Sequence, residues 1–337
     1  MLSCKKTYNI NILKNDWIEL QKKGGLNTPF QEYEYMKRTW QLLYPYYLKG
    51  KFVPRFYSFY DEGECIMILP SIHYWNSRKA ELLLNVNGLN YCDVLVLDER
   101  YIKQALILVA KDYDSLICNK VLESSLLYSA LKDTLSADQT VNNVCIHFGD
   151  NYEVYNKSLS KSTRQNLRTA YNRLNTDSKS LIFKVLIGSN DMNYAPFIDL
   201  YCKRHELRYG IKSNHLRKWF LLNQSFATLN YTMNKKGLTM ALYIDNQLAA
   251  FMSGMVGQKQ EYVVPRLSIN DDFGFYSPGM LLLNETVKYF IGNTDIRHLD
   301  LSQGEEQYKY KMGGIVHISH NFTIDLTRLN NDTQTTF

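Results

Sequence analysis

The stretch that decides the fold of this chain runs from Tyr276 to Leu283 and reads YSPGMLLL. It follows a strand-like segment, Glu261–Ile269, and opens a segment, Gly279–Ile291, whose apolar residues recur at helical spacing. Proline and glycine suit the first turn of a helix. The stretch therefore predicts a strand, a tight turn and a helix, which is the repeating step of an α/β protein.

The start of the predicted helix at Gly279 is a candidate anion site, because the first N–H groups of a helix are unpaired and the helix dipole favours negative charge there. The preceding strand contains Pro265. Proline cannot donate to a strand ladder and belongs at an edge or a bulge. A bulge would free main-chain groups for a bound ligand; the alternatives are an ordinary strand-to-helix turn and a plain edge strand.

Working outward, the second half of the chain alternates helices and strands. Beyond the segments above, we expect helices over Ser160–Leu174, Asp191–Leu207, Asn214–Asn223 and Glu305–Met312, and strands over Leu181–Ile187, Ala227–Met233, Leu238–Ile244, Leu248–Val256, Ile296–Leu301 and Ile315–Leu326.

The first half has a similar order of elements. We expect helices over Asp16–Gln21, Pro29–Tyr44, Glu99–Asp112 and Ser124–Thr134, and strands over Phe52–Tyr60, Cys65–Trp75, Ala80–Val86, Ser115–Val121 and Asn142–Phe148. The two halves predict a mixed α/β protein with two central sheets flanked by helices. The predicted domains are residues 1–150 and 151–329, followed by a disordered polar tail, 330–337.

The composition is that of a cytoplasmic globular protein. The 337 residues are 45% hydrophobic, and the net charge of +6 suits a phosphate-bearing ligand or an ordinary basic surface. The six cysteines lie mostly in apolar runs without close pairs, so we expect reduced thiols. Met1 to Trp17 lacks the apolar core of a signal peptide, and no run reaches the ~18 apolar residues of a membrane span.

Polar residues follow the predicted strand Ile296–Leu301 and are candidates for a site, because a ligand crevice often forms where sheet strands end. They are Asp300, Glu306, Tyr308 and Lys309. The alternative is local: Ser302 and Glu305 have the spacing of a capping box and would then only start a helix.

Two basic stretches complete the candidate residues. Arg164 and Arg168 share one helix face by their i, i+4 spacing and would suit an anionic ligand or a solvated helix. His205 and Arg208 stand near a helix end, where a histidine can act as a base and an arginine can bind a carboxylate or phosphate. The alternative for His205 is an ordinary surface side chain.

These pieces occur in a recognisable order. They are Ser-x-x-x-Arg-x-x-Leu-Arg from Ser160 to Arg168, the hairpin Leu238–Val256, the stretch from Tyr276 to Leu283, and Asp-x-x-x-Gly-x-Glu-x-Tyr-Lys from Asp300 to Lys309. The chain resembles the CelD-type (cellulose-biosynthesis) branch of GNAT acetyltransferases, which are related to the FemABX peptidyltransferases. Thr28–Gln31 and Asn90–Asp93 in the first half resemble the same branch, so the likeness covers nearly the whole chain.

The resemblance implies a tandem GNAT-like fold and transfer of an acyl group from acetyl-CoA or another acyl-CoA to an amine of a small acceptor, anionic or a cell-envelope precursor. It implies donor contacts at Ser277, Gly279, Met280, Lys309 and Val264; catalytic groups at Glu306, Asp300 and Tyr308; and acceptor contacts at Arg164, Arg168, Arg208, His205 and Tyr276. One departure is the acidic approach to the helix, Asp271 and Asp272, because acids repel phosphate.

Two other functions remain open. A FemABX-like enzyme would use aminoacyl-tRNA as the donor, which requires a larger basic surface, and such proteins usually carry a helical arm that this sequence lacks. A degenerate GNAT fold would bind a ligand without catalysis. The sequence gives no indication of DNA binding or of a metal site, since His317 and His320 lack a carboxylate at ligand spacing.

Overall fold

The computed structural model describes residues 2–48, 52–83, 91–135, 137–187, 193–210, 212 and 237–329. The chain forms two compact units. Unit 1 combines Met1–Val141 with Ile318–Phe337, and unit 2 is Asn142–His317. The predicted second domain ran further, to residue 329, and the predicted tail 330–337 lies outside the described residues.

Unit 1 contains a mixed sheet with the strand order β1-β2-β3-β4-β6-β13, in which β4 and β6 are parallel and the other neighbours are antiparallel. Its elements are β1 Ser3–Thr7, η1 Ile10–Leu13, α1 Lys14–Lys22, η2 Pro29–Gln31, α2 Tyr33–Leu48, β2 Phe52–Asp61, β3 Glu64–Tyr74, β4 Lys79–Leu82, β5 Leu95–Val96, α3 Arg100–Val109, β6 Ser115–Leu122, α4 Leu126–Leu131, η4 Lys132–Thr134 and the C-terminal part of β13, Gly314–Asp325.

A tight turn and an aromatic core organise unit 1. Glu62 and Gly63 both have positive φ, 49° and 85°, which matches the twist of the β2–β3 hairpin that they join. Trp17 is fully buried, and its indole N–H donates to the main-chain oxygen of Gln31, 2.8 Å away. The equally buried Gln31 amide donates to the Val94 oxygen, 2.6 Å away, so this buried polar side chain has a direct main-chain partner.

Unit 2 has the strand order β7-β12-β11-β10-β9-β8, in which β12 and β11 are parallel and the other neighbours antiparallel. Its elements are β7 Asp138–His147, which begins in unit 1, α5 Tyr152–Ser158, α6 Lys161–Thr176, β8 Leu181–Ile187, α7 Ala195–Tyr209, β9 Gly237–Ile244, β10 Gln247–Val256, β11 Glu261–Ile269, η6 Asp271–Tyr276, α10 Pro278–Asn293, β12 His298–Gln303 and α11 Gln307–Lys311.

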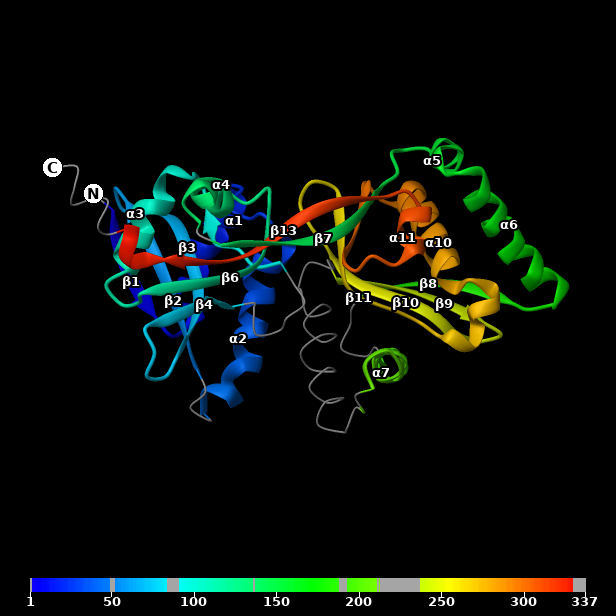
Figure 1. The fold of residues 1–337 in the computed structure, drawn as a ribbon, viewed down its shortest axis with the longest axis horizontal. Helices are drawn as coiled ribbons and strands as arrows, with labels where there is room; N and C mark the ends of the chain where they lie inside the picture. The colour runs from blue at the N-terminus through cyan, green and yellow to red at the C-terminus, as the bar shows by residue number, and fades with distance from the viewer. Residues whose placement is uncertain are drawn as a thin grey trace. The chain divides into compact units, whose positions relative to one another are not determined.

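Helices cover the two faces of the unit 2 sheet (Figure 1). On one face, α10 and α6 bury Leu283, Phe290 and Leu167 against strand residues such as Tyr262. On the other face, α7 packs Phe197, Ile198 and Cys202 against Ala241 and Phe251. Successive strand residues point to opposite faces, so the residues that alternate with Tyr262 and Leu299, namely Glu261, Val263, His298 and Asp300, point away from the α10 core.

The predicted mixed α/β class with helix-flanked sheets is confirmed. The strands predicted over Glu261–Ile269 and Leu181–Ile187 have the same bounds in the structure, whereas β1 and α5 were not predicted. The segments predicted over Asn214–Asn223 and Ala227–Met233 lie outside the described residues. Within the described part of the chain, no helix is long and apolar enough to cross a membrane.

Candidate functional site at a fork between two strands

The parallel strands β11 and β12 pair over a short length. Their three Cα pairs are Glu261–His298, Tyr262–Leu299 and Val263–Asp300. Beyond that point β11 continues to Ile269 and β12 to Gln303 without further pairing between them. We call this divergence, which begins after Val263 and Asp300, the strand fork.

A bulge in β11 accompanies the fork. The register between β10 and β11 shifts between Ser253 and Met255, so that Gly254 lies opposite two residues of β11. A Cβ atom on Gly254 would stand 2.1 Å from the Val263 oxygen, so a side chain does not fit there. Pro265 lies within this bulge, so of the two positions that the proline indicated, an edge or a bulge, the structure has the bulge.

The second strand of the fork, β12, ends in a tight loop that leads to α11. Ser302 and Gly304 have positive φ, 52° and 124°, and the pairing of β12 with β7 is irregular between Asp300 and Gln303. The Ser302 N–H donates to Asp300 Oδ1, 2.7 Å away. Helix α11 has Glu306 as its N-cap residue without a side-chain cap, so the capping box considered for Ser302 and Glu305 is not formed.

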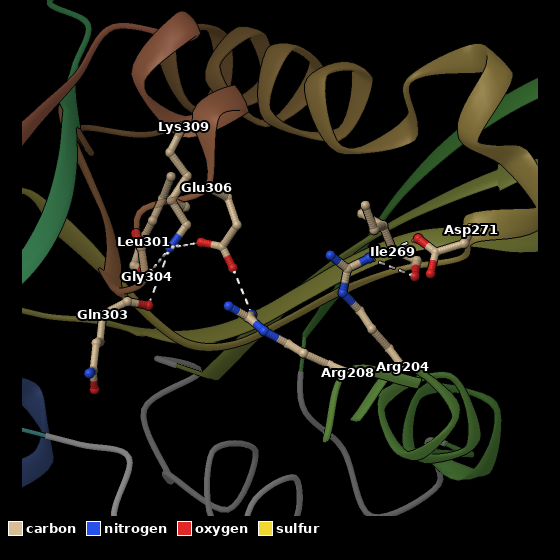
Figure 2. Close-up of polar contacts among 9 residues, drawn as sticks. All are labelled: Arg204, Arg208, Ile269, Asp271, Leu301, Gln303, Gly304, Glu306 and Lys309. Carbon is tan, nitrogen blue, oxygen red and sulfur yellow. Dashed lines mark hydrogen bonds and ion pairs between the residues drawn. The ribbon is translucent and has the colours of Figure 1, made fainter. Parts of the chain in front are cut away.

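Lys309 of α11 fixes this loop from inside. Its side chain is 4% exposed, and Nζ donates to the main-chain oxygens of Leu301 (3.2 Å), Gln303 (3.3 Å) and Gly304 (3.1 Å) (Figure 2). The same ammonium lies 3.1 Å from Glu306 Oε2. Burial lowers the pKa of Lys309, although Glu306 opposes that effect. Lys309 therefore holds the end of β12 against the start of α11.

Glu306 links α11 to α7. Its Oε1 lies 3.1 Å from Nη1 of Arg208, while its Oε2 pairs with Lys309 (Figure 2). Burial acts to raise the pKa of the Glu306 carboxyl, but the charge and hydrogen bond of Lys309 and the hydrogen bond from Arg208 outweigh it, and the pKa lies below its ordinary value. Glu306 is thus ionised near neutral pH.

Arg204, one turn before Arg208, binds the end of β11. Its Nη1 donates to the Ile269 oxygen at 3.3 Å and to Asp271 Oδ1 at 3.2 Å (Figure 2). Lys203 pairs with Asp272 at 2.8 Å. Both acids that precede the α10 start are therefore paired with cations of α7. Arg204 was not among the residues predicted for the site, although its i, i+4 spacing from Arg208 indicates a shared helix face.

The start of α10 lies beside this cluster of charges. Ser277 has φ 53°, and its side chain does not cap the helix. Its main-chain oxygen accepts hydrogen bonds from the N–H groups of Met280 (3.0 Å) and Leu281 (3.2 Å). A Cβ atom on Gly279 would lie 3.4 Å from Ile269 and 3.7 Å from the Tyr308 ring. Tyr308, selected from the sequence as a site residue, thus lies next to Gly279.

Tyr308 keeps its proton near neutral pH. Burial, with a smaller contribution from the Glu306 charge, raises the pKa of the Tyr308 hydroxyl well above its ordinary value, although Arg204 and Arg208 act in the opposite direction. A neutral phenol beside a carboxylate and two guanidinium groups is a hydrogen-bond donor, and it can serve as a general acid if a stronger base forms nearby.

Val264 and Met280, which the resemblance placed in contact with the donor, belong to the core of unit 2. Val264 is 2% exposed and Met280 is 7% exposed, and both pack in the core under α10. The Tyr276 hydroxyl donates to Asp177 Oδ2 at the end of α6, 2.6 Å away.

The basic residues of α6 make local contacts. Arg164 donates to the main-chain oxygens of Lys157, 2.9 Å away, and Leu159. Arg168 donates to Gln165 at 3.5 Å and is exposed. Because α6 covers the α10 face of the sheet and α7 the other face, these arginines are not gathered with Arg208. His205 lies on α7, its ring 6.4 Å from that of Tyr201.

At the closed end of the fork, Asp300 pairs with His317 of β13, which was not predicted as a site residue. The Asp300 carboxyl is nearly buried, and its Oδ2 lies 3.2 Å from Nε2 of His317. Burial lowers the pKa of His317, but Asp300 and Glu261 outweigh it, so the pKa is raised. Glu261 begins β11; burial and then the Asp300 charge raise its pKa to about 7. This acid–histidine group was not predictable from spacing, since its members belong to three strands.

Comparison with known proteins agrees with this architecture. Residues 161–310 match the family model described as an acetyltransferase (GNAT) domain. A tandem GNAT protein from the clavulanic acid biosynthesis pathway is similar in structure, with 12% identity, a TM-score of 0.54, and 97% of this chain and 99% of that chain covered. No curated protein matches the chain in sequence.

Two further solved structures are similar over most of their length. FemX has 9% identity and a TM-score of 0.59, with 98% of this chain and 99% of that chain covered. L-PGS from Bacillus licheniformis has 12% identity and a TM-score of 0.53, with 92% and 91% covered. At such low identity these likenesses establish the fold alone. The chain therefore has a tandem GNAT-like fold, and its second unit carries the segment that matches a GNAT acetyltransferase domain.

Proposed function

We propose that unit 2 transfers an acyl group from acyl-CoA, most simply acetyl-CoA, to an amine of a small acceptor. The observation that carries this proposal is the strand fork, which lies within the segment that matches a GNAT domain. After Val263, β11 pairs with β10 but no longer with β12. The edge of β11 that faces the fork is thus suited to a linear donor arm, whose amide groups bind main-chain groups as an added strand would.

The phosphates of the donor would bind at the start of α10. The helix dipole favours an anion there. The N–H groups of Ser277 and Met280 already donate to the main-chain oxygens of Gly274 and Ser277, so an anion would have to compete for them. The neighbouring acids are a weaker objection than their sequence suggests, because Lys203 pairs with Asp272 and Arg204 with Asp271. The donor contacts that we propose are Ser277, Gly279 and Met280 at the helix start, Val264 on β11, and Lys309 through the loop that it holds.

In the proposed reaction, the acceptor nitrogen attacks the thioester carbonyl carbon. The new C–N bond forms, the C–S bond breaks, the nitrogen loses a proton and the CoA sulfur gains one. Tyr308 is the candidate acid, since its raised pKa keeps the phenol protonated. Of the two candidate acidic residues, Glu306 has both oxygens in ion pairs, whereas Asp300 stands at the closed end of the fork. Asp300 is therefore the better placed to assist proton transfer.

We infer that the acceptor carries negative charge. Arg208 donates from Nη1 to Glu306 at the start of α11, and His205 lies one turn earlier on the same helix. Arg164 and Arg168 lie over the other face of the sheet, and Tyr276 bonds Asp177 at the end of α6, so these three residues are not part of the acceptor site that we propose. An anionic cell-envelope precursor fits this description and the resemblance to the CelD-type branch. A donor of this kind assigns the reaction to the cytoplasm, which is compatible with six cysteines that form no disulfide.

The fold also suits a second donor. FemX, at a TM-score of 0.59, has the highest score of the three structures compared above, and FemABX-like enzymes use aminoacyl-tRNA. The exposed basic residues of helix α6, such as Lys161 and Arg168, would then bind the phosphates of the RNA. Salt-sensitive binding of tRNA without binding of acyl-CoA would support this alternative, and binding of acyl-CoA without any turnover would indicate a non-catalytic GNAT fold.

The proposal is tested by titration calorimetry of the full chain with acetyl-CoA and longer acyl-CoAs. We expect saturable binding that Gly279→Asp abolishes, because the new carboxylate would stand where the phosphates bind. The matched control is Gly292→Asp, near the other end of α10, where a Cβ atom meets nothing within 4 Å. Equal affinity in the two variants would remove the proposed phosphate site, and circular dichroism checks that both are folded.

A further inference from the structure

The pair of Asp300 and His317 lies where a thioester bound in the fork would approach the joined ends of β11 and β12. Asp300 is the last residue of β12 that pairs with β11, and its side chain is 6% exposed. Its Oδ1 accepts the Ser302 N–H at 2.7 Å, and its Oδ2 lies 3.2 Å from His317 Nε2. Both carboxyl oxygens are engaged, so Asp300 is built to hold the imidazole rather than to take a proton from a substrate.

His317 is better suited to accept that proton. Its side chain is 30% exposed, and the contact of Nε2 with Asp300 favours the tautomer that carries hydrogen on Nε2. The other ring nitrogen, Nδ1, is then a base. Glu306, the alternative acid, is bound by Arg208 and Lys309, and two cations at hydrogen-bond distance make a carboxylate a weaker base.

Several titratable groups of the described residues surround His317. Asp300 of β12 and Glu261 of β11 raise its pKa against the effect of burial. Cys145 of β7 stands opposite Asp300 in the sheet register, and burial raises the pKa of its thiol, so it stays neutral near pH 7. Lys259, before β11, lowers the pKa of Glu261, against the larger effects of burial and Asp300. The surroundings are net acidic and stabilise the protonated imidazole.

We propose that His317, oriented by Asp300, is the general base of the acyl transfer. This inference rests on the proposed function. In the step, the acceptor nitrogen forms its bond to the carbonyl carbon and gives a proton to Nδ1 of His317, and the CoA sulfur leaves with the electron pair of the C–S bond. The sulfur takes up the proton of the Tyr308 hydroxyl, and the imidazolium proton then replaces it on the phenolate oxygen by way of solvent, so that amine and thioester become amide and thiol without any other reactant. Asp300 acts as a positioning residue.

The first test is nuclear magnetic resonance of the full chain labelled with ¹⁵N-histidine. His317→Gln identifies the His317 signals among the seven histidines. We expect the non-transferable analogue S-acetonyl-CoA to shift these signals, and Asp300→Asn to lower the pKa of His317, since it removes a neighbouring charge that raises it. If calorimetry shows that the analogue binds but the His317 signals do not move, the base assignment is wrong while the donor site stands. If no acyl-CoA binds, the proposed function fails first.

The second test is turnover, measured as CoA released from acetyl-CoA with water or hydroxylamine as acceptor. We expect His317→Gln to lower kcat at least ~10²-fold, which is typical for loss of a general base, with donor affinity within about twofold of the wild type. The matched control is His320→Gln on the same strand, since that histidine pairs with Asp138 of unit 1, 2.8 Å away. Wild-type kcat in His317→Gln overturns the proposal, and the resonance test decides it where neither acceptor reacts.

Discussion

Replacing Glu261 with glutamine should stabilise the folded chain at alkaline pH. The Glu261 carboxyl packs over Gly257, where a Cβ atom would lie 2.5 Å from Oε1. Burial there, with the Asp300 charge as the next cause, raises the pKa of Glu261 from 4.5 to about 7. In the unfolded chain this acid ionises at its ordinary pKa, so the folded state binds the proton more tightly than the unfolded state.

The sign follows from proton linkage. Below about pH 4.5 both states are protonated and Glu261 costs nothing. Between about pH 4.5 and 7 only the unfolded state is ionised, so stability falls as the pH rises. Above pH 7 the cost is constant at ~3 kcal/mol, from 1.36 kcal/mol per pKa unit and the raised pKa. Glutamine keeps the shape of the side chain and removes this cost.

The measurement is urea unfolding followed by circular dichroism at pH 5 and pH 8. We expect Glu261→Gln to raise the free energy of unfolding by ~3 kcal/mol at pH 8 and by under ~1 kcal/mol at pH 5. Glu153→Gln, at an exposed position in the same unit, is the matched control and should change it by under ~0.5 kcal/mol at both. A variant no more stable than the wild type at pH 8 would refute the reasoning, because Glu261 would then be solvated or well paired in the folded protein.

Two further substitutions test the frame of the fork. Lys309→Met should cost ~3 kcal/mol of unfolding free energy, because it leaves the Glu306 carboxylate and three main-chain oxygens without the buried ammonium; a loss under ~1 kcal/mol in urea unfolding would contradict the role assigned to Lys309. Gly254→Ala should destabilise by more than ~2 kcal/mol, since its Cβ would stand 2.1 Å from the Val263 oxygen, whereas Gly274→Ala, with open space around it, should be nearly neutral. Equal melting temperatures for the two alanine variants would contradict the bulge geometry.

The strands of unit 2 could be predicted because their signals are local. Leu181–Ile187 and Glu261–Ile269 are short apolar runs bounded by polar or turn residues, and both have the predicted bounds. Strand β1 was missed because Ser3–Thr7 is polar and mostly exposed, and its register comes from pairing with β2. Helix α5 was missed because it begins directly after the predicted domain boundary at residue 150, where we expected a connection, although Asn151 caps the helix by accepting from the N–H groups of Glu153 and Val154.

The site could be predicted in part for the same reason. Glu306 and Lys309 are three residues apart on one short helix, so their pairing follows from sequence spacing. Arg208 reaches Glu306 from 98 positions earlier in the chain, and His317 meets Asp300 from another strand. Such partners depend on strand order and helix placement, which a single sequence does not specify. The assignment of donor, acceptor and catalytic roles stays a prediction for the experiments above.

The division of the chain between its units has a consequence for synthesis. Strand β6 of unit 1 pairs with β13, whose residues Ser319–Asp325 follow the whole of unit 2 in the chain. Every residue of unit 2 is therefore synthesised before the last strand of unit 1. Until β13 emerges from the ribosome, the edge of β6 that pairs with it stays unpaired. Unpaired strand edges are where chains misassociate, so during translation the second unit has the opportunity to finish folding while the first is still vulnerable to aggregation.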